Sequence, residues 1–396
     1  MSVFKQISSI TTMNLRSIPQ RLGTSFVIVI GIAGVVGVML SVLAMATGML
    51  KTISNTGSPD RAIVLRGGSN AEIASAISRD AALTIGDAPG VKHSADGKPI
   101  ISADSITLVE VPTEAGSSWA NITVRGVGPK IMELRPEMKI TQGRMYRPAV
   151  HELIVGSKAN QEFSSLQVGH KLRFANDDWE VVGVFASGGD KHESEIYGDG
   201  ETVMSAIKRG GFQPVTVRLE SAAAFDQFKT ALTTNPTLTV DVKRESEFFA
   251  EQGKPTARII SIIAYVVGGI MAVGALFGAL NTMYSAVSAR ALEIATLRAL
   301  GFGATSVVIS VFAEALALSL VGAGLGAFAA WLFFDGNVIN SSAGGGGISQ
   351  LVFTLVLTPA LVSLGIIWAC VIGLVGGLFP ALRAARLPVA QALRAV

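Results

Sequence analysis

Long apolar runs with almost no charge constrain this chain more than any other feature. Residues 259–289 contain no Asp, Glu, Lys or Arg, and Glu314 is the only such residue between Ala299 and Phe334. Charged residues make up 15% of the chain, which is low for a soluble protein. Since about 20 apolar residues cross the hydrocarbon core of a bilayer, we expect an α-helical membrane protein. Four transmembrane helices are predicted, at 25–50, 257–286, 305–334 and 351–380.

The first of these runs could instead be the apolar core of a secretory signal peptide. It is about 20 residues long, which is more than such a core needs. No small-x-small cleavage site followed by the start of a soluble domain accompanies it. We therefore interpret 25–50 as an uncleaved span.

Residues 51–256, between the first two predicted spans, have a different composition. Within 51–258, 24 Lys and Arg residues accompany 26 Asp and Glu residues. Gly and Pro separate short stretches that have the patterns of strands or helices. The two patterns alternate without a strict strand–helix–strand period, which is typical of α+β domains. We expect one large extracytoplasmic α+β domain at 51–256.

The distribution of charge predicts the orientation of the chain. Outside 51–258 there are 8 Lys and Arg residues but only 3 Asp and Glu residues. Basic residues beside spans favour the cytoplasmic side, so both termini are predicted to be cytoplasmic. Residues 1–24 fit an amphipathic helix on the cytoplasmic face, and 381–396 fit a cytoplasmic tail. Residues 335–350 lack Lys and Arg and should form a short periplasmic loop. A basic excess confined to the ends of spans also argues against a nucleic-acid partner.

Residues 287–304 form a short charged segment between the second and third predicted spans. Leu292, Ile294, Leu297 and Leu300 follow helical spacing, with Glu293 and Arg298 beside them. Gly301 and Gly303 supply a stop signal. The segment is expected to be a short helix at the cytoplasmic surface of the membrane.

Motifs for catalysis or nucleotide binding are absent from the sequence. Gly97-Lys98 and Gly253-Lys254 are each followed by proline, which gives neither the hydroxyl nor the helix of a phosphate-binding loop. No G-x-S-x-G, H-E-x-x-H or paired-cysteine pattern occurs. The acidic and histidine-containing stretch at 190–195 is expected to be a solvated loop that meets a partner rather than a metal site. We therefore predict a non-catalytic chain with no metal or cofactor of its own.

Glu314 lies within the third predicted span, where a carboxylate is costly and marks a functional hypothesis. One interpretation is proton coupling. The other is a hydrogen bond between helices near the inner face. The predicted spans contain no charged relay partner for Glu314, which favours the second interpretation.

Three stretches resemble the permease subunits of the MacB/LolC/FtsX-type (type VII) ABC transporters. The first is Leu292-Glu293-Ile-Ala-Thr-Leu-Arg298-Ala-Leu-Gly301, followed by Phe312-Ala-Glu314-Ala. It is similar to the family signature R-E-I-x-x-x-R-A-L-G…E-A, with Leu292 in place of the usual basic residue. The second, from Gly377 to Arg394, is similar to the ending P-A-x-x-A-A-R-x-x-P-V-x-A-L-R. The third is suggestive of the family's periplasmic domain: Val124-Arg-Gly126-Val, Gly143-Arg144, Glu152-Leu-Ile-Val-Gly156, Val168-Gly169 and Val181-Val-Gly183-Val.

The resemblance implies that 287–304 is a coupling helix that docks on a cytoplasmic ABC ATPase subunit. ATP and Mg²⁺ would then bind to that partner and not to this chain. The implied ATPase contacts are Arg290, Glu293, Ile294, Leu297, Arg298 and Gly301; Glu314 is the intramembrane polar residue, and Pro380, Arg383 and Arg386 belong to the cytoplasmic tail.

The resemblance further implies a bacterial inner-membrane protein with a second permease copy or paralogue. Membrane lipids, and a periplasmic adaptor, lipoprotein or outer-membrane channel, are further partners to consider. By similarity the periplasmic domain divides into a base at 51–118 and 206–256 and an inserted tip at 119–205.

Spans with so little charge cannot line a hydrated path for ions or sugars. The first hypothesis is therefore a permease that moves a lipid, lipoprotein or other amphiphile by transmitting ATPase motion to its periplasmic domain. The alternative is an FtsX-like signal transmitter that regulates a periplasmic enzyme. A membrane adaptor with no ATPase would leave 290–301 without a role.

Overall fold

The computed structural model describes residues 3–17, 22–112, 119–341 and 350–386. Two compact units make up the chain. The helical unit comprises residues 1–47, 259–337 and 356–396, and the sheet unit comprises 48–258 and 338–355.

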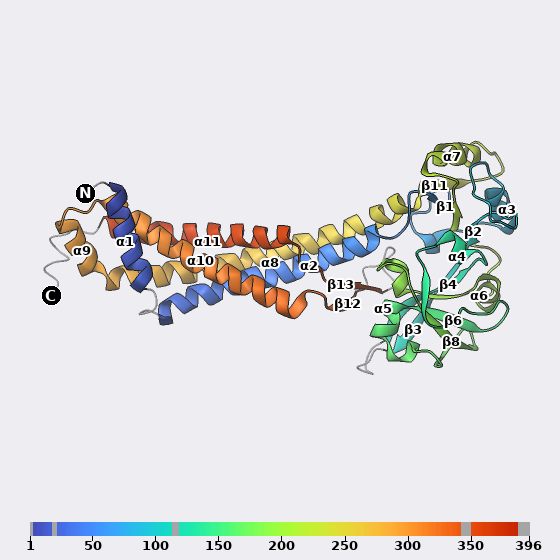
Figure 1. Ribbon diagram of the computed structural model, residues 1–396, viewed down its shortest axis with the longest axis horizontal. Helices are drawn as coiled ribbons and strands as arrows, with labels where there is room; N and C mark the ends of the chain where they lie inside the picture. Colours follow the sequence, from blue (N-terminus) through green and yellow to red (C-terminus); the bar gives the residue numbers. More distant parts are fainter. Residues whose placement is uncertain (1–2, 18–21, 113–118, 342–349, 387–396) are drawn as a thin grey trace. The chain divides into compact units, whose positions relative to one another are not determined.

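Four helices are long and apolar enough to cross a membrane. They are α2 (Leu22–Ser54), α8 (Glu245–Ala289), α10 (Ala304–Phe334) and α11 (Pro359–Ala385). Within the helical unit they lie side by side, and α1 (Val3–Ser17) packs against α10 (Figure 1). Large apolar side chains such as Ile270 and Phe333 are 69% and 65% exposed. An apolar surface of this extent suits contact with lipid rather than water.

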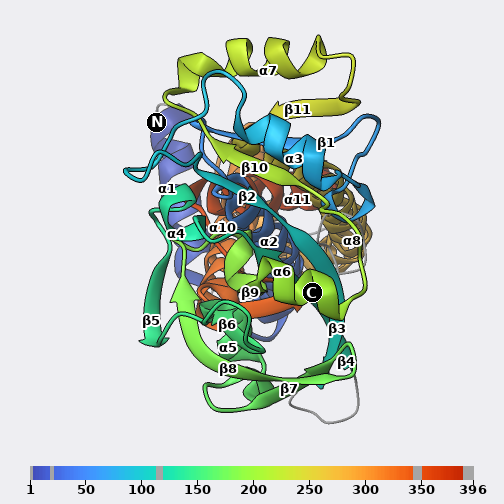
Figure 2. The same cartoon turned by 90° about the vertical axis from the view of Figure 1, so that its right-hand side faces the viewer.

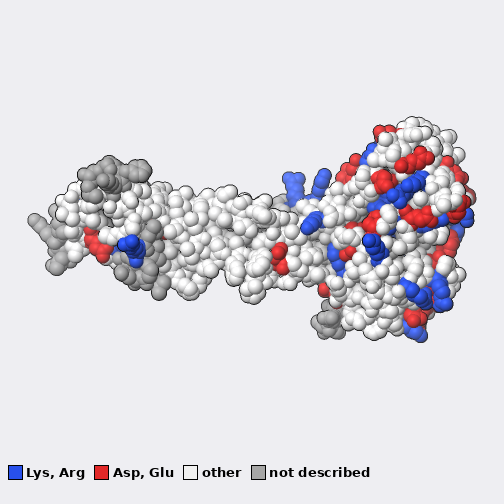
Figure 3. All heavy atoms as spheres, viewed as in Figure 1, with Lys and Arg blue, Asp and Glu red and all other residues white. Residues whose placement is uncertain are grey.

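Charge is distributed very unevenly over the surface. The visible face of the helical unit carries almost no Lys, Arg, Asp or Glu, whereas these residues cover much of the sheet unit (Figure 3). The helical unit thus has the surface expected of a bilayer-spanning bundle.

Small residues bring α2 and α10 into close contact. A Cβ built on Gly326 would lie 2.5 Å from the carbonyl oxygen of Ala33 and 3.1 Å from the backbone nitrogen of Gly37. Neither backbone atom can move without shifting α2. A Cβ on Gly324, two residues earlier and therefore on the opposite side of the same helix, meets nothing within 4 Å. Close backbone approach of this kind is how small residues stabilise helix pairs in membranes.

We predict that Gly326→Ala lowers the free energy of unfolding by about 1–3 kcal/mol, because the added methyl group forces the two helices apart. The matched change Gly324→Ala should stay within about 0.5 kcal/mol of wild type. Thermal unfolding of the purified protein in nanodiscs measures both. Equal losses in the two variants would contradict the proposed contact.

The smaller of the two main sheets in the sheet unit has four antiparallel strands, in the order β11-β1-β10-β2. These strands are β1 (Arg61–Arg66), β2 (Ile101–Ala103), β10 (Val215–Arg218) and β11 (Val240–Arg244). Helices α3 (Arg79–Gly86) and α7 (Phe225–Thr233) pack on this sheet. Their apolar side chains, including Ile85 and Phe228, form a core with Ala62 and Val64.

The larger sheet has seven strands, in the order β3-β4-β9-β6-β8-β5, with β7 paired to β8 (Figure 2). Its β4–β9 and β6–β8 pairs are parallel. Trp179 and Phe163 are fully buried in its core. The strands are β3 (Ser105–Pro112), β4 (Trp119–Val127), β5 (Lys139–Gly143), β6 (Glu152–Gly156), β7 (Lys171–Phe174), β8 (Asp177–Ala186) and β9 (Ile196–Asp199); the short helices are α4 (Ile131–Leu134), α5 (Ser157–Glu162) and α6 (Gly200–Ala206).

Four single turns of 3₁₀ helix complete the sheet unit: η2 (Glu72–Ala74), η3 (Ser164–Leu166), η4 (Lys191–Ser194) and η5 (Ala222–Ala224). The division between the two sheets falls between Ala103 and Ser105, earlier than the boundary at 118/119 expected from the sequence. β3 pairs along its whole length with β4, so it belongs to the larger sheet.

Residues 335–358 also differ from the expected loop and start of a span. Val338–Ser341 (β12) and Leu351–Thr354 (β13) pair as an antiparallel hairpin. Val352 lies in the core of the larger sheet, and its backbone N–H and C=O both bond the hydroxyl of Ser194 at 3.0 Å. Helix α11 begins only at Pro359, after Thr358 caps it, and runs beyond residue 380 to Ala385.

Candidate functional site

The short charged segment folds as the separate helix α9 (Ala291–Ala299). Glu293 lies in its first turn and Arg298 in its last, so both charges complement the helix dipole. Gly301 has φ +94°, a left-handed conformation that glycine adopts without strain, and it ends the segment before α10. Local sequence signals thus account for both ends of the helix.

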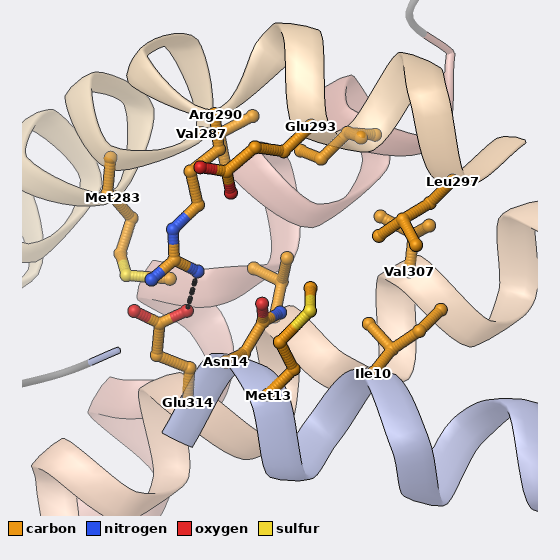
Figure 4. A pocket seen from close by; sticks show the side chains of 13 residues that line it. Ile10, Met13, Asn14, Met283, Val287, Arg290, Glu293, Leu297, Val307 and Glu314 are labelled. Carbon is orange, nitrogen blue, oxygen red and sulfur yellow. Dashed lines mark hydrogen bonds and ion pairs between the residues drawn. The ribbon is translucent and has the colours of Figure 1, made fainter. Parts of the chain in front are cut away.

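Arg290, just before α9, forms an ion pair with Glu314 of α10 (Figure 4). Arg290 Nη1 donates to Glu314 Oε2 at 2.9 Å, and each residue is only 5% exposed. The pair lines a small cavity of about 20 Å³ beside Ile10, Met13 and Val311. This volume suits a single water molecule and no larger ligand.

The ion pair supplies the charged partner for Glu314 that the predicted spans lack. Arg290 lies outside the helices, between α8 and α9, and reaches into the bundle. The geometry therefore fits a contact that fixes α9 to α10, which is the second interpretation of Glu314. Removing one member of a buried ion pair leaves an uncompensated charge, at a cost of about 3–5 kcal/mol.

We predict that Arg290→Gln and Glu314→Gln each destabilise the purified protein by about 3 kcal/mol. The double variant should lose clearly less than the sum, because neither charge then lacks its partner. Chemical or thermal unfolding in nanodiscs gives the three values. Strictly additive losses would show that the pair contributes no coupling energy.

The outer face of α9 is partly apolar and partly charged. Glu293, Leu292 and Leu300 are exposed, the last two at 46% and 72%. An open polar groove of about 950 Å³ separates α9 from α1 and is lined by residues such as Thr12, Arg16, Glu293 and Thr296. This face has the mixed chemistry of a protein-binding surface.

The six expected ATPase contacts differ in how far they are exposed on α9 and beside it. Arg290 and Ile294 are buried within the helical unit, so their side chains are not presented on the outer face in this structure. Glu293 and Gly301 are exposed, and Leu297 and Arg298 are half-buried. Arg298 Nη1 donates to the carbonyl of Ala385 at 2.8 Å, which joins α9 to the end of α11.

The three residues assigned to the cytoplasmic tail are helical or cap the helix α11. Pro380 is buried inside α11. Arg383 lies over the ring of Tyr284 at 5.5 Å, and Arg386 is an exposed C-cap. The part of the expected tail from 387 onward lies outside the described residues.

The expectation of a solvated loop at 190–195 is wrong, because this stretch is buried in the sheet unit. Asp190, His192, Glu193 and Glu195 are between 1% and 5% exposed. His192 Nδ1 bonds Asp190 Oδ2 at 2.9 Å. Burial holds the pKa of His192 well below its usual value, so the ring is neutral at pH 7. No group of potential ligands with metal-site geometry occurs among the described residues.

Arg125 of β4 is the centre of this buried charge cluster. It contacts Glu195 at 2.7 Å, Glu72 at 2.8 Å and Asp104 at 3.0 Å. Burial alone would raise the pKa of Glu72 and Glu195, but Arg125 and then Lys191 outweigh it and lower both. Burial dominates at Asp104 and raises its pKa to about 6. Glu72 and Asp104 follow strands of the smaller sheet, so the cluster links the two sheets.

The raised pKa of Asp104 predicts a specific pH dependence. Burial favours the protonated form of Asp104 in the folded protein. Its contribution to the free energy of unfolding is complete below pH 3.8, the ordinary pKa that we take for the unfolded chain, and is lost as the pH rises through about 6. Titration of His192, whose pKa is lowered, changes stability in the opposite direction over a similar pH range. The effect of Asp104 is therefore read from the difference between a variant and wild type at each pH. Relative to wild type, Asp104→Asn should gain stability from pH 4 to pH 7, by up to about 3 kcal/mol. Thermal unfolding at several pH values measures the difference, and a constant difference would contradict the assignment.

Two features together define the class of ABC transporter permeases. One is the unit of two sheets inserted after the first apolar helix, and the other is the charged helix between two further apolar helices. Residues 22–235 match the model of the MacB-like periplasmic core domain, and residues 265–389 match that of the FtsX-like permease C-terminal domain. The chain therefore belongs to the MacB/FtsX-type ABC transporter permeases. Membership implies an ATPase partner, typically a dimer, and a multi-pass protein of the inner membrane.

Relatives extend over nearly the whole chain. The ABC transporter permease YknZ of Bacillus subtilis is 26% identical over 98% of this chain and 97% of its own length. The macrolide export ATP-binding/permease protein MacB of Bdellovibrio bacteriovorus is 23% identical, and the match covers 93% of this chain but 58% of MacB. MacB of Campylobacter jejuni is 25% identical, with 98% and 60% covered. The chain thus spans less than two thirds of these MacB proteins.

Two solved structures are similar to part of the chain. The extracellular domain of YknZ aligns with a TM-score of 0.36 at 16% identity, over 46% of this chain and 99% of that domain. The periplasmic region of MacB from Actinobacillus actinomycetemcomitans aligns with a TM-score of 0.38 at 15% identity, over 52% of this chain and 97% of that region.

Proposed function

We propose that this permease converts ATP hydrolysis by a separate cytoplasmic ATPase into motion of its sheet unit outside the cytoplasm. In this mechanism the motion moves a lipid, lipoprotein or other amphiphile, and no cargo passes through the helices. Two permease copies and two ATPase subunits form the working assembly, as is usual for the family. This chain binds no ATP; nucleotide and Mg²⁺ belong to the partner.

The observation that carries the proposal is the charge-poor interior of the helical unit. Among the described residues of the four apolar helices, Glu314 is the charged residue buried in the bundle, and it is neutralised by Arg290. A hydrated path for a polar substrate needs more polar groups than this. The motion that the ATPase drives therefore acts on cargo outside the bundle, at the sheet unit.

The proposed orientation follows from the same charges. Helix α1, helix α9 and the end of α11 carry basic residues, which favours the cytoplasmic side for all three. The sheet unit then lies outside the cytoplasm. Glu293, with the exposed Leu292 and Leu300, forms the docking face of α9 for the ATPase.

Nucleotide hydrolysis in nanodiscs tests the transport function. The permease and its ATPase would be reconstituted together, and amphiphiles of different classes added. We expect at least one class to stimulate hydrolysis in the intact complex. Absence of stimulation by any amphiphile, together with capture of a periplasmic hydrolase by the complex, would instead support the FtsX-like alternative.

We predict that Glu293→Lys abolishes association with the ATPase, because it reverses the charge at the centre of the docking face. Membrane insertion should be unchanged, since the Glu293 side chain is exposed and lies outside the apolar runs. Co-purification from solubilised membranes measures association. Glu110→Lys, at an exposed position of β3, is the control and should bind normally. Survival of co-purification in Glu293→Lys would remove α9 from the proposed interface.

A further inference from the structure

Glu245, the first residue of α8, is completely buried although it is ionised. Its Oε2 atom lies 2.5 Å from Arg61 Nε of β1, in the smaller sheet. Its Oε1 atom lies 2.5 Å from Arg135 Nη2, in the segment between α4 and β5 of the larger sheet. The two oxygens of one carboxylate therefore hold one sheet each. Their charge also suits the N-terminus of the helix that carries it.

The chain that leaves α2 is attached to the same carboxylate. Ser58 N–H donates to Glu245 Oε2 at 3.3 Å. Gly57, with φ +92°, packs so closely that a Cβ would lie 2.8 Å from the backbone nitrogen of Ser246. Only glycine fits this position without moving the first turn of α8.

The two arginines depend on Glu245 to different degrees. Arg61 has a second acidic partner, Glu137, at 2.7 Å, and it also donates to the carbonyl of Leu134. Arg135 has Glu245 as its carboxylate partner within the described part of the chain, and its Nε and Nη1 atoms make no hydrogen bond there. Loss of Glu245 therefore leaves Arg135 as a buried charge without compensation.

The next turn of α8 makes a second contact with the larger sheet. Phe249 is 1% exposed and lies 5.7 Å from His192, ring centroid to ring centroid. The Lys191 ammonium is 4.9 Å from the centroid of Phe249. The backbone N–H of Lys191 donates to Thr56 Oγ1 at 2.9 Å, just after α2. The beginning of α8 and the end of α2 are thus fixed to the same group of residues.

We propose that Glu245 is a positioning residue that transmits displacement of α8 to the larger sheet through Arg135, while Arg61 holds the carboxylate in place and the smaller sheet follows α8 directly through β11, the strand that runs into it. This inference rests on the proposed function, in which the sheet unit moves. An ion pair with two branches at the first turn of a helix is stiff, because neither sheet can follow a different path without separating buried opposite charges.

Distances between spin labels in the assembled complex test the inference. The lone cysteine, Cys370, is first replaced by serine. A label is then placed at Gln227, on α7 over the smaller sheet, or at Asp178, on β8 of the larger sheet; both positions are exposed. Distances between equivalent labels in the two permease copies are measured in nanodiscs, with and without ATP.

In wild type, both labels should change distance when ATP is added. Glu245→Gln should leave the change at Gln227, because β11 runs directly into α8, and should clearly reduce the change at Asp178, while the complex still assembles and hydrolyses ATP. Glu247→Gln, on the same turn but with a side chain 64% exposed, is the matched control and should behave as wild type. If wild type itself shows no change during hydrolysis, the proposed function fails. If Glu245→Gln moves as wild type does, the function stands and the inference is overturned.

Arg135→Gln provides an independent test should Glu245→Gln fail to fold. It keeps the Arg61–Glu245 pair and cuts the branch to the larger sheet. The label at Gln227 should still move as in wild type, and the label at Asp178 should move clearly less, because Phe249 remains as the contact of α8 with the larger sheet. Arg135→Lys, which retains the charge, should restore part of the movement at Asp178. Normal movement of both labels in Arg135→Gln would overturn the inference.

Discussion

A charge that leaves water must find an opposite charge, and this constraint shapes both units of the protein. In the helical unit one pair, Arg290 and Glu314, fixes the charged helix to the apolar bundle. In the sheet unit Arg125 gathers three carboxylates between two sheets, and Glu245 gathers two arginines. Such pairs contribute little net stability compared with apolar packing, but breaking one is costly. They therefore define geometry more than they increase stability.

The difference between the units reflects the difference between their surroundings. Lipid offers an apolar side chain no advantage in burial, so the helices of the bundle are held by close contact at glycines such as Gly37 and Gly326. The sheet unit carries charge over much of its surface (Figure 3) and is held by ordinary apolar cores, around residues such as Phe228 in the smaller sheet and Trp179 and Phe185 in the larger. Its charge clusters join the two sheets: Arg125 of β4 pairs with Glu72 and Asp104, and Glu245 pairs with Arg61 and Arg135.

The sequence predicted the class of protein because its strongest signals are long and local. The apolar runs give four helices, and the motif from Leu292 to Gly301 gives the family, which the family models confirm. The ends of these helices were harder to predict. Helix α8 begins at Glu245, twelve positions before the expected span, and Pro255 lies inside it. Proline usually ends a helix, and the first turns of α8 are polar, so no local signal predicts that the helix continues back to Glu245.

Buried charges were missed for a related reason. Charged residues in a sequence are normally exposed, and the stretch at 190–195 was interpreted on that basis. The partners of the buried charges are distant in sequence: 70 residues separate Arg125 from Glu195, and 184 separate Arg61 from Glu245. No local pattern encodes such pairs. The one available signal was Arg125 itself, the single charged residue of a strand that is otherwise uncharged.

The hairpin of β12 and β13 has a consequence for the order in which the protein is made. Val352 lies in the core of the larger sheet, whose own strands lie between residues 105 and 199. A ribosome therefore releases most of that sheet, and then two further apolar helices, before it supplies the last piece. Until residue 355 has been synthesised, the hydroxyl of Ser194 and the apolar surface around it lack the contacts that Val352 makes. Completion of the sheet unit is thus tied to synthesis of α10, the third apolar helix.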